Sequence, residues 1–371
     1  MELHLVVFLA ALIIYIFFLA LNISSLVFKT PKIQNNKDNP SVSVVIAIRN
    51  GEKSIPNLIN CINKQNYQGQ FEFILVDDES EDSSKSLILE AVNTNTKIKY
   101  ASSVEGNNQL SFKKRALDAG IKKSQYDILL FTDVDCSFGN KWVSSMAKKF
   151  SDKVDYVVGF SKAKRKYGLA NLFQRTDFLI LMFSAKAFCD LGYPLASSGQ
   201  NQGYRKNLFN KIGGYEKIKK LLMGDDSIFL QLCNKLKANI VFNDDKESFV
   251  YCRPEKKWID LFKQRVRWAG DGKIMWRYNF SFYIIMVSTV LSNFFIIFIL
   301  FTESFDTFYI VFVIKLISEL MLQRLGSYRF KISIPITHFI FWYIINIPYV
   351  FLMCLGSFFV HHLSWQNRAQ K

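Results

Sequence analysis

At residues 128 to 136 the sequence reads Ile128-Leu-Leu-Phe-Thr-Asp-Val-Asp-Cys136, an apolar run that ends in two aspartates. The run predicts a buried strand. Residues two apart in a strand point to the same side, so Asp133 and Asp135 bring two carboxylates together beyond the strand, where open α/β sheets bind ligands. A divalent cation with a diphosphate would relieve their repulsion, and Mg²⁺ and Mn²⁺ prefer such oxygen ligands. The alternative is a solvated acidic turn, because a lone Asp-x-Asp is common by chance.

The composition indicates a basic, partly membrane-bound protein of one large domain or two small ones. Half of the 371 residues are hydrophobic, 35 are Phe, and the formal net charge is +16. Basic surfaces meet nucleic acid, anionic lipid or phosphorylated substrates, and the apolar ends of this chain favour membrane lipids. No zinc knuckle or RNA-binding aromatic motif occurs, so nucleic acid is not an expected partner.

Cysteines and histidines limit the chemistry of the central region. The six cysteines are scattered without metal-site or redox spacing, which indicates reduced thiols facing a cytosolic compartment. The four histidines, His4, His338, His361 and His362, all lie in the terminal regions. A histidine base, a Ser-His-Asp triad and a histidine-rich metal site are therefore excluded from the middle of the chain.

The first 28 residues predict a transmembrane helix. The stretch from Leu3 to Phe28 is almost continuously apolar and exceeds the roughly 20 residues that cross a bilayer. The alternative, a cleaved signal peptide, is disfavoured because the stretch lacks a basic start and a small-residue cleavage site. Residues 29–40 are polar and predict a linker.

Residues 41–252 predict one α/β domain. Strands are expected at 42–48, 71–76, 97–101, 128–131 and 156–160, and helices at 55–63, 80–92, 112–121 and 142–150. Such alternation predicts a mostly parallel, doubly wound sheet. Asp77 and Asp78 follow the second strand, so carboxylates end two strands, as expected for a ligand crevice.

The second half of this domain carries a further acidic pair. Residues 169–188 predict a long helix, either core or lying on the membrane, and residues 197–203 a loop. Gly224-Asp-Asp226 precedes an apolar helical stretch at 228–236. The plain interpretation is helix capping, but capping needs only one of the two acids.

The C-terminal third predicts a membrane region. Residues 253–278 form an amphipathic interfacial segment, residues 279–362 a transmembrane region, and 363–371 a tail. About three spans are expected, Phe280–Phe301, Phe308–Leu322 and Ile332–Val360, with Lys315 and Glu319 able to pair within the second.

Loop charges predict the orientation. The central region is basic, the loop at Glu303 and Asp306 carries no base, and the next loop carries Arg324, Arg329 and Lys331. The positive-inside rule then makes the central region cytoplasmic. The sequence therefore predicts a multi-pass integral protein of the cell inner membrane with its catalytic domain in the cytoplasm.

Four groups of residues occur in an order that carries a family resemblance. They are Ser43-Val-Val-Ile-Ala-Ile-Arg-Asn50, Val76-Asp-Asp-Glu-Ser80, Thr132-Asp-Val-Asp-Cys136, and Gly224-Asp-Asp226 with Gln264-Arg-Val-Arg-Trp268. Together they resemble the membrane-embedded family 2 glycosyltransferases of GT-A fold, which include cellulose, hyaluronan and ceramide-glucosyl transferases. Each motif alone is weak, but the ordered set across residues 41–268 is specific.

The resemblance implies a role for each matching residue. It assigns nucleotide-sugar binding to Arg49, Asn50, Asp77, Asp78, Lys113 and Asp133. It assigns the metal to Asp135 with Asp133, the catalytic base to Asp226 with Asp225 beside it, and the acceptor and diphosphate side to Gln264, Arg267 and Trp268. Two positions depart from the family, because Gly51 and Asp225 stand where it usually carries Glu.

The implied reaction is inverting, metal-dependent transfer of a sugar from a nucleotide sugar, expected to be a UDP-sugar, to a lipid or polysaccharide acceptor. Mn²⁺ or Mg²⁺ and an arginine would stabilise the leaving diphosphate, and a carboxylate would take the acceptor proton. A nucleotidyltransferase is the first alternative, but Arg49-Asn-Gly51 is too short for its glycine-rich phosphate loop. An inactive membrane scaffold is the second, and the intact acids argue against it.

Overall fold

The computed structural model describes residues 3–28, 36, 38–221, 223–302 and 305–359. The predicted tail at 363–371, most of the 29–40 linker, Glu303, His361 and His362 lie outside them. The chain divides into two compact units. One, here called the sheet unit, comprises residues 31–164 and 196–253; the other, the helical unit, comprises residues 1–30, 165–195 and 254–363.

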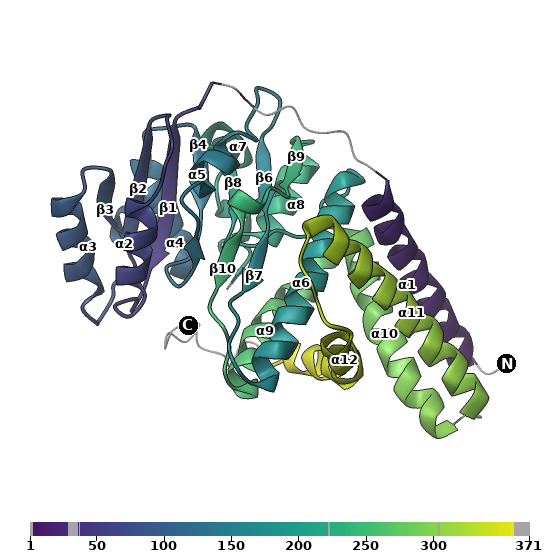
Figure 1. Ribbon diagram of the computed structural model, residues 1–371. Helices are drawn as coiled ribbons and strands as arrows, with labels where there is room; N and C mark the ends of the chain where they lie inside the picture. The colour runs from purple at the N-terminus through teal and green to yellow at the C-terminus, as the bar shows by residue number, and fades with distance from the viewer. Residues whose placement is uncertain (1–2, 29–35, 37, 222, 303–304, 360–371) are drawn as a thin grey trace. The chain divides into compact units, whose positions relative to one another are not determined.

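The sheet unit is built on a seven-stranded sheet (Figure 1), whose order is β3-β2-β1-β4-β8-β6-β9. The strands are β1 (Val42–Ile48), β2 (Phe71–Asp77), β3 (Ile98–Ser102), β4 (Ile128–Phe131), β6 (Tyr156–Gly159), β8 (Gln202–Arg205) and β9 (Ile240–Asn243). All pairings are parallel except those of β8 with β4 and β6. Every residue of β2 and β4 is buried, as expected for strands that are apolar apart from Glu72 and Asp77 of β2.

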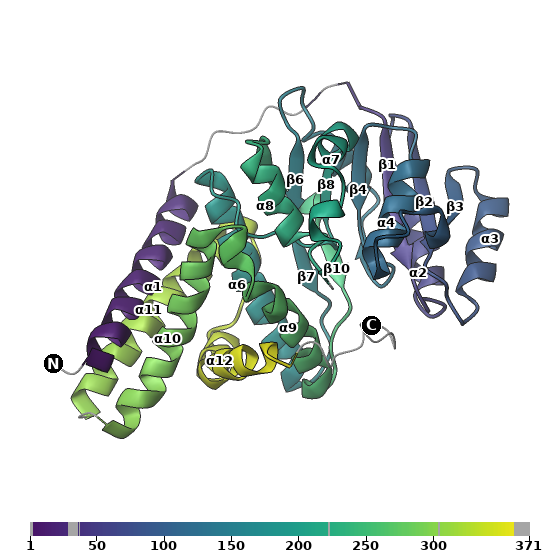
Figure 2. The ribbon, with the colours of Figure 1, turned by 180° about the vertical axis from the view of Figure 1, so that it is seen from behind.

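Helices cover both faces of this sheet (Figures 1 and 2). They are α2 (Ile55–Asn63), α3 (Ser84–Thr94), α4 (Phe112–Lys123), α5 (Trp142–Ala147), α7 (Lys206–Ile212) and α8 (Ser227–Lys235). The first three strands are added in one direction and β4 on the other side of β1, so right-handed crossovers place α4 opposite α2 and α3. The predicted α/β class with a mostly parallel sheet is confirmed.

Two parts of the sheet unit differ from the prediction. The stretch predicted as a loop at 197–203 ends inside strand β8, whose sequence Gln-Gly-Tyr-Arg lacks an apolar pattern. A second sheet joins β5 (Ser137–Phe138), β7 (Ser161–Ala163) and β10 (Val250–Cys252). These strands have two or three residues each, too few to produce a recognisable period.

The helical unit packs α1 (Leu3–Val27) against α10 (Phe280–Thr302) and α11 (Phe305–Phe330), which lie side by side in Figure 1. It also contains α6 (Leu169–Asp190), α9 (Trp258–Gly272) and α12 (Ile336–Ser357), with α12 packed against α6, α9 and α10. Aromatic and aliphatic side chains of all six helices form one core.

Three described helices are long and apolar enough to cross a membrane: Leu5–Val27, Phe280–Thr302 and Ile336–Ser357. The prediction of one N-terminal span is confirmed. The prediction of about three C-terminal spans was wrong, because two are found among the described residues. The expected span Phe308–Leu322 lies within α11, which carries Lys315, Glu319, Arg324 and Arg329 and is too polar by composition. Lys315 and Glu319 do pair, and both are buried inside the helical unit.

Strand β8 should tolerate no side chain at Gly203. A Cβ there would lie 2.5 Å from Leu130 Cδ2 and 2.9 Å from the Leu129 carbonyl oxygen of β4. Gly203→Ala should therefore cost about 1–3 kcal/mol and lower the Tm of the detergent-solubilised protein by several degrees. Gly139→Ala is the control, since nothing lies within 4 Å of its Cβ position. Equal Tm values for the two variants would contradict this packing.

Candidate active site

The site lies at the carboxyl edge of the parallel strands β2, β1 and β4. In their register Ile48 pairs with Asp77, and Val45 pairs with Phe131, two residues before Asp133. Because these three strands run parallel, their carboxyl ends lie at the same edge of the sheet. The sheet thus brings the first two predicted acidic motifs to one side of the sheet unit.

Asp133, Asp135 and the Cys136 thiol form a compact group in the turn after β4, with one potential ligand atom from each lying within 4.8 Å of the others. Burial, followed by repulsion from Asp133, raises the pKa of Asp135 to about 6. Burial also raises the pKa of Cys136, so its sulfur remains a thiol, a poor ligand for hard cations. The two carboxylates therefore suit Mg²⁺ or Mn²⁺ through oxygen, and their mutual repulsion is what a cation would relieve.

Asp225 and Asp226 stand at the start of α8. Gly224 has φ +101°, a left-handed conformation that suits glycine and turns the chain into the helix. Asp226 caps α8, because one carboxylate oxygen accepts from the Ser227 amide while the other accepts from the Gly199 amide at 3.2 Å. Burial, followed by the charge of Asp225, raises the pKa of Asp226 to about 6.

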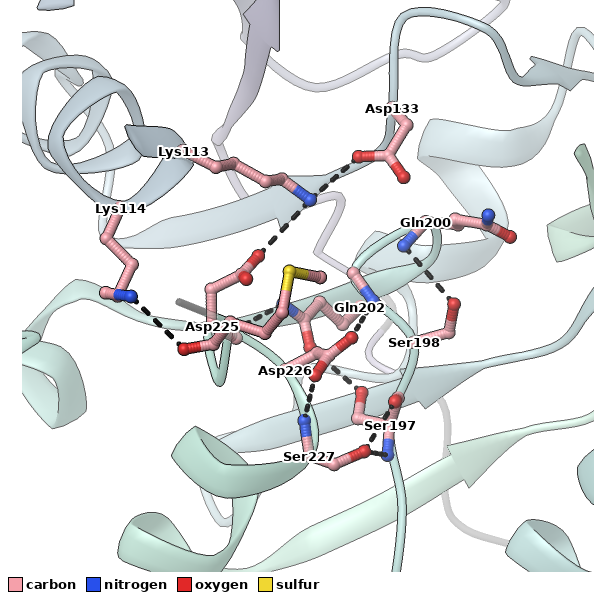
Figure 3. A network of polar contacts seen from close by, with 12 residues as sticks. Lys113, Lys114, Asp133, Ser197, Ser198, Gln200, Gln202, Asp225, Asp226 and Ser227 are labelled. Atoms are coloured by element: carbon pink, nitrogen blue, oxygen red, sulfur yellow. Dashed lines mark hydrogen bonds and ion pairs between the residues drawn. The ribbon is translucent and has the colours of Figure 1, made fainter. Parts of the chain in front are cut away.

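Lys113 of α4 joins these two acidic groups (Figure 3). Its ammonium lies 2.8 Å from an Asp133 oxygen and 3.2 Å from an Asp225 oxygen. Burial alone would lower the pKa of Lys113, but Asp133 and Asp225 outweigh it and raise that pKa above its usual value. The structure thus places Lys113 among the acids of both motifs.

The loop before β8 closes over this cluster and was not recognised as part of the site from the sequence. A Cβ on Gly199 would lie 3.1 Å from Lys113 Nζ and 3.4 Å from an Asp225 oxygen, so only backbone fits there without displacing the ammonium. Gln202 donates to the Asp225 carbonyl at 3.1 Å, and Ser197 and Ser227 bond to each other (Figure 3). The signal in the sequence was the run of small and amide residues at 197–203.

Lys114 was also missed. This residue is 1% exposed, and its ammonium donates to the carbonyls of Leu221 and Met223, the latter at 3.1 Å. Both carbonyls lie just before Gly224. The two adjacent lysines of α4 therefore have different roles. Lys113 pairs with the carboxylates of Asp133 and Asp225, and Lys114 holds the backbone of the segment just before Asp225 and Asp226.

Asp77, Asp78, Arg49 and Asn50 come together at the ends of β1 and β2. The buried Arg49 guanidinium donates to the carbonyls of Asp78 at 2.9 Å and Glu79 at 2.6 Å, and pairs with Glu81. Asp77 accepts from the Ser80 amide, and Asn50 from the Glu81 amide. Arg49 is thus engaged in holding the loop after β2, while Asp77 and Asn50 shape the same loop.

Local packing explains why a glycine, rather than the glutamate usual in the resembled family, stands at position 51. A Cβ there would lie 3.0 Å from Ile48 Cγ2 and 3.1 Å from Cγ2 of Val134, the residue between the two metal-motif aspartates. A larger side chain would press on the turn that carries Asp133 and Asp135. Glu52 instead accepts from the Ser83 amide.

Gln264, Arg267 and Trp268 belong to α9 of the helical unit. Trp268 packs on the guanidinium of Arg265, whose carbon lies 4.0 Å from the ring centre. Arg265 is buried and pairs with Asp177 of α6 at 2.8 Å. Arg265 therefore holds Trp268 in place. The sequence indicated only that the two residues are spaced to lie on one face of a helix.

Comparisons with known proteins bear on the family and the fold of the chain. Residues 43–213 match the sequence pattern of glycosyl transferase family 2. The glycosyltransferase AglE of Haloferax volcanii is 24% identical over 241 residues, covering 63% of this chain and 73% of AglE. Residues 43–213 therefore form a family 2 glycosyltransferase domain. The chain is accordingly a glycosyltransferase, as predicted.

A solved structure extends the likeness to the whole fold. The mannosyltransferase PcManGT from Pyrobaculum calidifontis, in complex with GDP-Man and Mn²⁺, superposes with a TM-score of 0.61 over 98% of both chains at 12% identity. The predicted GT-A fold is confirmed by this likeness. The matched pattern at 43–213 includes Asp77, Lys113 and Asp133, and ends before Asp225.

Removing the Lys113 ammonium should destabilise the transferase domain. Lys113→Met leaves the Asp225 carboxylate, only 4% exposed, without its cationic partner, at a cost of roughly 2 kcal/mol. The charge of Lys113 also lowers the pKa values of Asp135 and Asp226, which are already raised to about 6. Without it these two pKa values would rise further in the folded chain, so the loss should shrink as the pH falls from 7.5 to 5. Thermal unfolding at both pH values measures this.

Lys122→Met is the matched control on the same helix. Its ammonium is more than half exposed and pairs with Asp118 at 2.9 Å, an interaction worth at most about 1 kcal/mol. Equal losses of stability for the two variants, or a Lys113→Met loss that grows in acid, would contradict the role given to Lys113.

Proposed function

We propose that the chain is an inverting glycosyltransferase that passes a sugar from a nucleotide sugar to a lipid or glycan acceptor at the cytoplasmic face of the cell inner membrane. The observation that carries the proposal is the cluster of Asp133, Asp225 and Asp226 around Lys113 (Figure 3), with Asp135 beside Asp133 in the turn after β4. It combines a place for a cation and a diphosphate with a buried carboxylate able to accept a proton.

Asp226 is the proposed base. Its two oxygens accept from the Ser227 and Gly199 amides, so its orientation is fixed by backbone. Its raised pKa, about 6, keeps it mostly ionised at neutral pH while making it a better proton acceptor than an ordinary aspartate. With one base and no carboxylate nucleophile, the acceptor would displace the nucleoside diphosphate directly. An α-linked donor would then give a β-linked product.

Asp135 and Asp133 are the proposed metal ligands, for Mn²⁺ or Mg²⁺. A bound divalent cation supplies neutralisation of the charge that develops on the leaving diphosphate. PcManGT is in complex with GDP-Man and Mn²⁺, which supports a metal and a nucleotide sugar in a chain of the same fold. Until a nucleotide sugar binds, Lys113 partly neutralises Asp133; with one bound, its ammonium is a natural partner for a phosphate.

The remaining roles follow the family resemblance. Asp77, Asp78 and Asn50 would bind the nucleoside of a UDP-sugar, supported by Arg49. Gln264, Arg267 and Trp268 would line the acceptor and diphosphate side. The three apolar helices support a membrane location, and the basic charge of the central region supports its cytoplasmic placement.

The test is nucleotide release by the purified full chain in detergent with Mn²⁺ or Mg²⁺, UDP- and GDP-sugars, and added membrane lipids as acceptors. One donor should give a nucleoside diphosphate. Asp226→Asn should lower the rate by about 10²–10⁴-fold, and Asp135→Ala or EDTA should remove it. Asp152→Asn, which alters an exposed acid of the same unit, should be unchanged.

Other results would reject the proposal. Release of pyrophosphate would identify a nucleotidyltransferase, and no release with any donor and lipid would favour a scaffold. Equal rates for wild type and Asp226→Asn would remove Asp226 as the base.

The rate should also fall in acid. The carboxylate form of Asp226 is the active base, so kcat/KM should decline about tenfold per pH unit below roughly pH 6. Initial rates from pH 4.5 to 8 measure this, with circular dichroism confirming that the protein stays folded. A rate independent of pH over this range would contradict the assignment.

A further inference from the structure

A buried polar network joins β6 and β8 to the segment that begins α8. Tyr156 of β6 and Gln202 of β8 are fully buried, and Ser197 is 6% exposed. Tyr156 pairs with Tyr204 in the sheet, two residues beyond Gln202, so Tyr156 and Gln202 are diagonal neighbours on one face. Buried polar groups need hydrogen-bond partners, and these three side chains find theirs in one another and in the Asp225 carbonyl. None of the roles given above uses Tyr156.

The contacts of the Gln202 amide fix its orientation. The Asp225 carbonyl can only accept, so Gln202 Nε2, which lies 3.1 Å from it, must be the donor. Gln202 Oε1 then accepts from the hydroxyl of Tyr156 at 2.5 Å and from the hydroxyl of Ser197 at 2.9 Å. Exchanging the nitrogen and oxygen of the amide would bring two oxygens together at Asp225. The two hydroxyls therefore keep the amide turned toward the Asp225 carbonyl.

Ser197 makes a second connection to the residues Asp225 to Ser227, here called the base segment. The Ser227 hydroxyl donates to the Ser197 carbonyl at 2.9 Å and accepts from the Ser197 amide at 3.2 Å (Figure 3). Asp225 and Ser227 stand on either side of Asp226. The backbone on both sides of the proposed base is thus held by residues of one short stretch, 197–202.

Gln202 also ties the base segment to the metal motif. In the ladder of β8 and β4, Gln202 pairs with Phe131, the last residue of β4. Asp133 follows Phe131 by two residues. Because backbone hydrogen bonds hold the two strands in register, Gln202 has a fixed place beside the strand that ends in Asp133 and Asp135. Its side chain carries that fixed place across to the Asp225 carbonyl.

Direct displacement depends on the distance between these two groups. The leaving diphosphate stands at the cation, and the acceptor oxygen stands at the base, on opposite sides of the anomeric carbon. Both must be in place at the same moment, and a misplacement of about 1 Å can cost about 10²-fold in rate. A side chain that fixes the base relative to the metal motif therefore acts on the rate without touching the substrate.

We propose that Tyr156 and Gln202 are positioning residues that set the distance between the base segment and the turn that carries Asp133 and Asp135. This inference rests on the proposed function. Gln202 holds the Asp225 carbonyl, and the Tyr156 hydroxyl holds Gln202 in the orientation that this requires. Neither side chain carries a charge, so their loss should act on kcat and not on the binding of the cation or the donor.

The test uses initial rates of nucleoside diphosphate release by the full chain in detergent, with Mn²⁺ and with UDP-glucose, UDP-N-acetylglucosamine and GDP-mannose as donors. Gln202→Met keeps the length of the side chain and removes all three hydrogen bonds, so kcat should fall about 10–100-fold. Tyr156→Phe removes one, so kcat should fall about three- to tenfold. The donor KM, and the affinity for Mn²⁺ measured by EPR with UDP present, should stay within about twofold of wild type.

Ser43→Ala is the matched control for Tyr156→Phe. Its hydroxyl is also buried and donates to the buried Glu72 at 2.6 Å, but Ser43 lies near the amino end of β1, at the edge of the sheet opposite the site. Ser43→Ala should lower the Tm as Tyr156→Phe does and leave kcat unchanged. Equal falls of kcat in the two variants, or a raised donor KM with kcat unchanged in Tyr156→Phe, would overturn the positioning role.

Gln202→Glu gives a pH signature that loss of stability alone would not produce. A protonated carboxyl can donate to the Asp225 carbonyl and accept from the Tyr156 hydroxyl, whereas a carboxylate can only accept. Burial raises the pKa of a carboxyl, so the ratio of the variant's kcat to that of wild type should rise as the pH falls from about 9 to 6. The loss of the Asp226 base in acid affects both proteins and cancels in this ratio. A ratio that does not change with pH would contradict the proposal.

The outcomes separate this inference from the proposed function. A wild type that releases no nucleoside diphosphate with any donor would reject the proposed function, and this inference with it. An active wild type whose kcat is matched by Gln202→Met and by Tyr156→Phe would overturn only the positioning role. Circular dichroism of each variant establishes that it is folded, and Tyr156→Phe, the most conservative change, keeps the test decisive if Gln202→Met does not fold.

Discussion

The ion pairs of Lys113 with Asp133 and Asp225 are the interaction on which the site depends. They join residues from three separate parts of the chain, the start of α4, the turn after β4 and the segment before α8. One ammonium cannot neutralise four carboxylates, and the pKa values of Asp135 and Asp226 are both raised to about 6 by burial and by neighbouring acids. The excess negative charge makes the cluster receptive to a cation.

The backbone is arranged to hold this excess charge. Parallel strands β2, β1 and β4 end at one edge, and the antiparallel β8 brings the 197–201 loop over the cluster. Gly199 allows the backbone to approach Lys113, and Lys114 ties down the carbonyls before Gly224. A side chain at position 199 would displace the Lys113 ammonium, which is 3.1 Å from the position of a Cβ there. The site is therefore preorganised by backbone more than by side chains.

The sequence predicted those parts of the fold that have a period or an apolar run. The observed strands Val42–Ile48 and Ile128–Phe131 match the predicted ones, because buried parallel strands are continuously apolar. Once the end of the second of these strands was predicted, the acids that come after it could be placed at the edge of the sheet. Strand β8 was missed because Gln202-Gly-Tyr-Arg205 has no such pattern, and its place is set by its two neighbours. Helix α11 was predicted to be a span although it carries Lys315, Glu319, Arg324 and Arg329; the spacing of Lys315 and Glu319 predicted their ion pair, but not that the pair would be buried among the other helices of the helical unit.

The site was predictable to the same extent. Asp77, Asp133 and Asp226 were predicted as candidates because they follow strands or precede a helix, whereas the partners of Lys113 depend on tertiary structure alone. Arg49 shows the opposite case: its place in a motif indicated nucleotide binding, whereas its guanidinium is occupied by backbone carbonyls of the loop after β2.

The most direct test of this account is the anomeric configuration of the transferred sugar, determined by NMR on product made from an α-linked nucleotide sugar. A single displacement assisted by Asp226 predicts a β-linked product. An α-linked product would contradict the account, because retention requires a second displacement or a different geometry from the one that these four carboxylates and Lys113 provide.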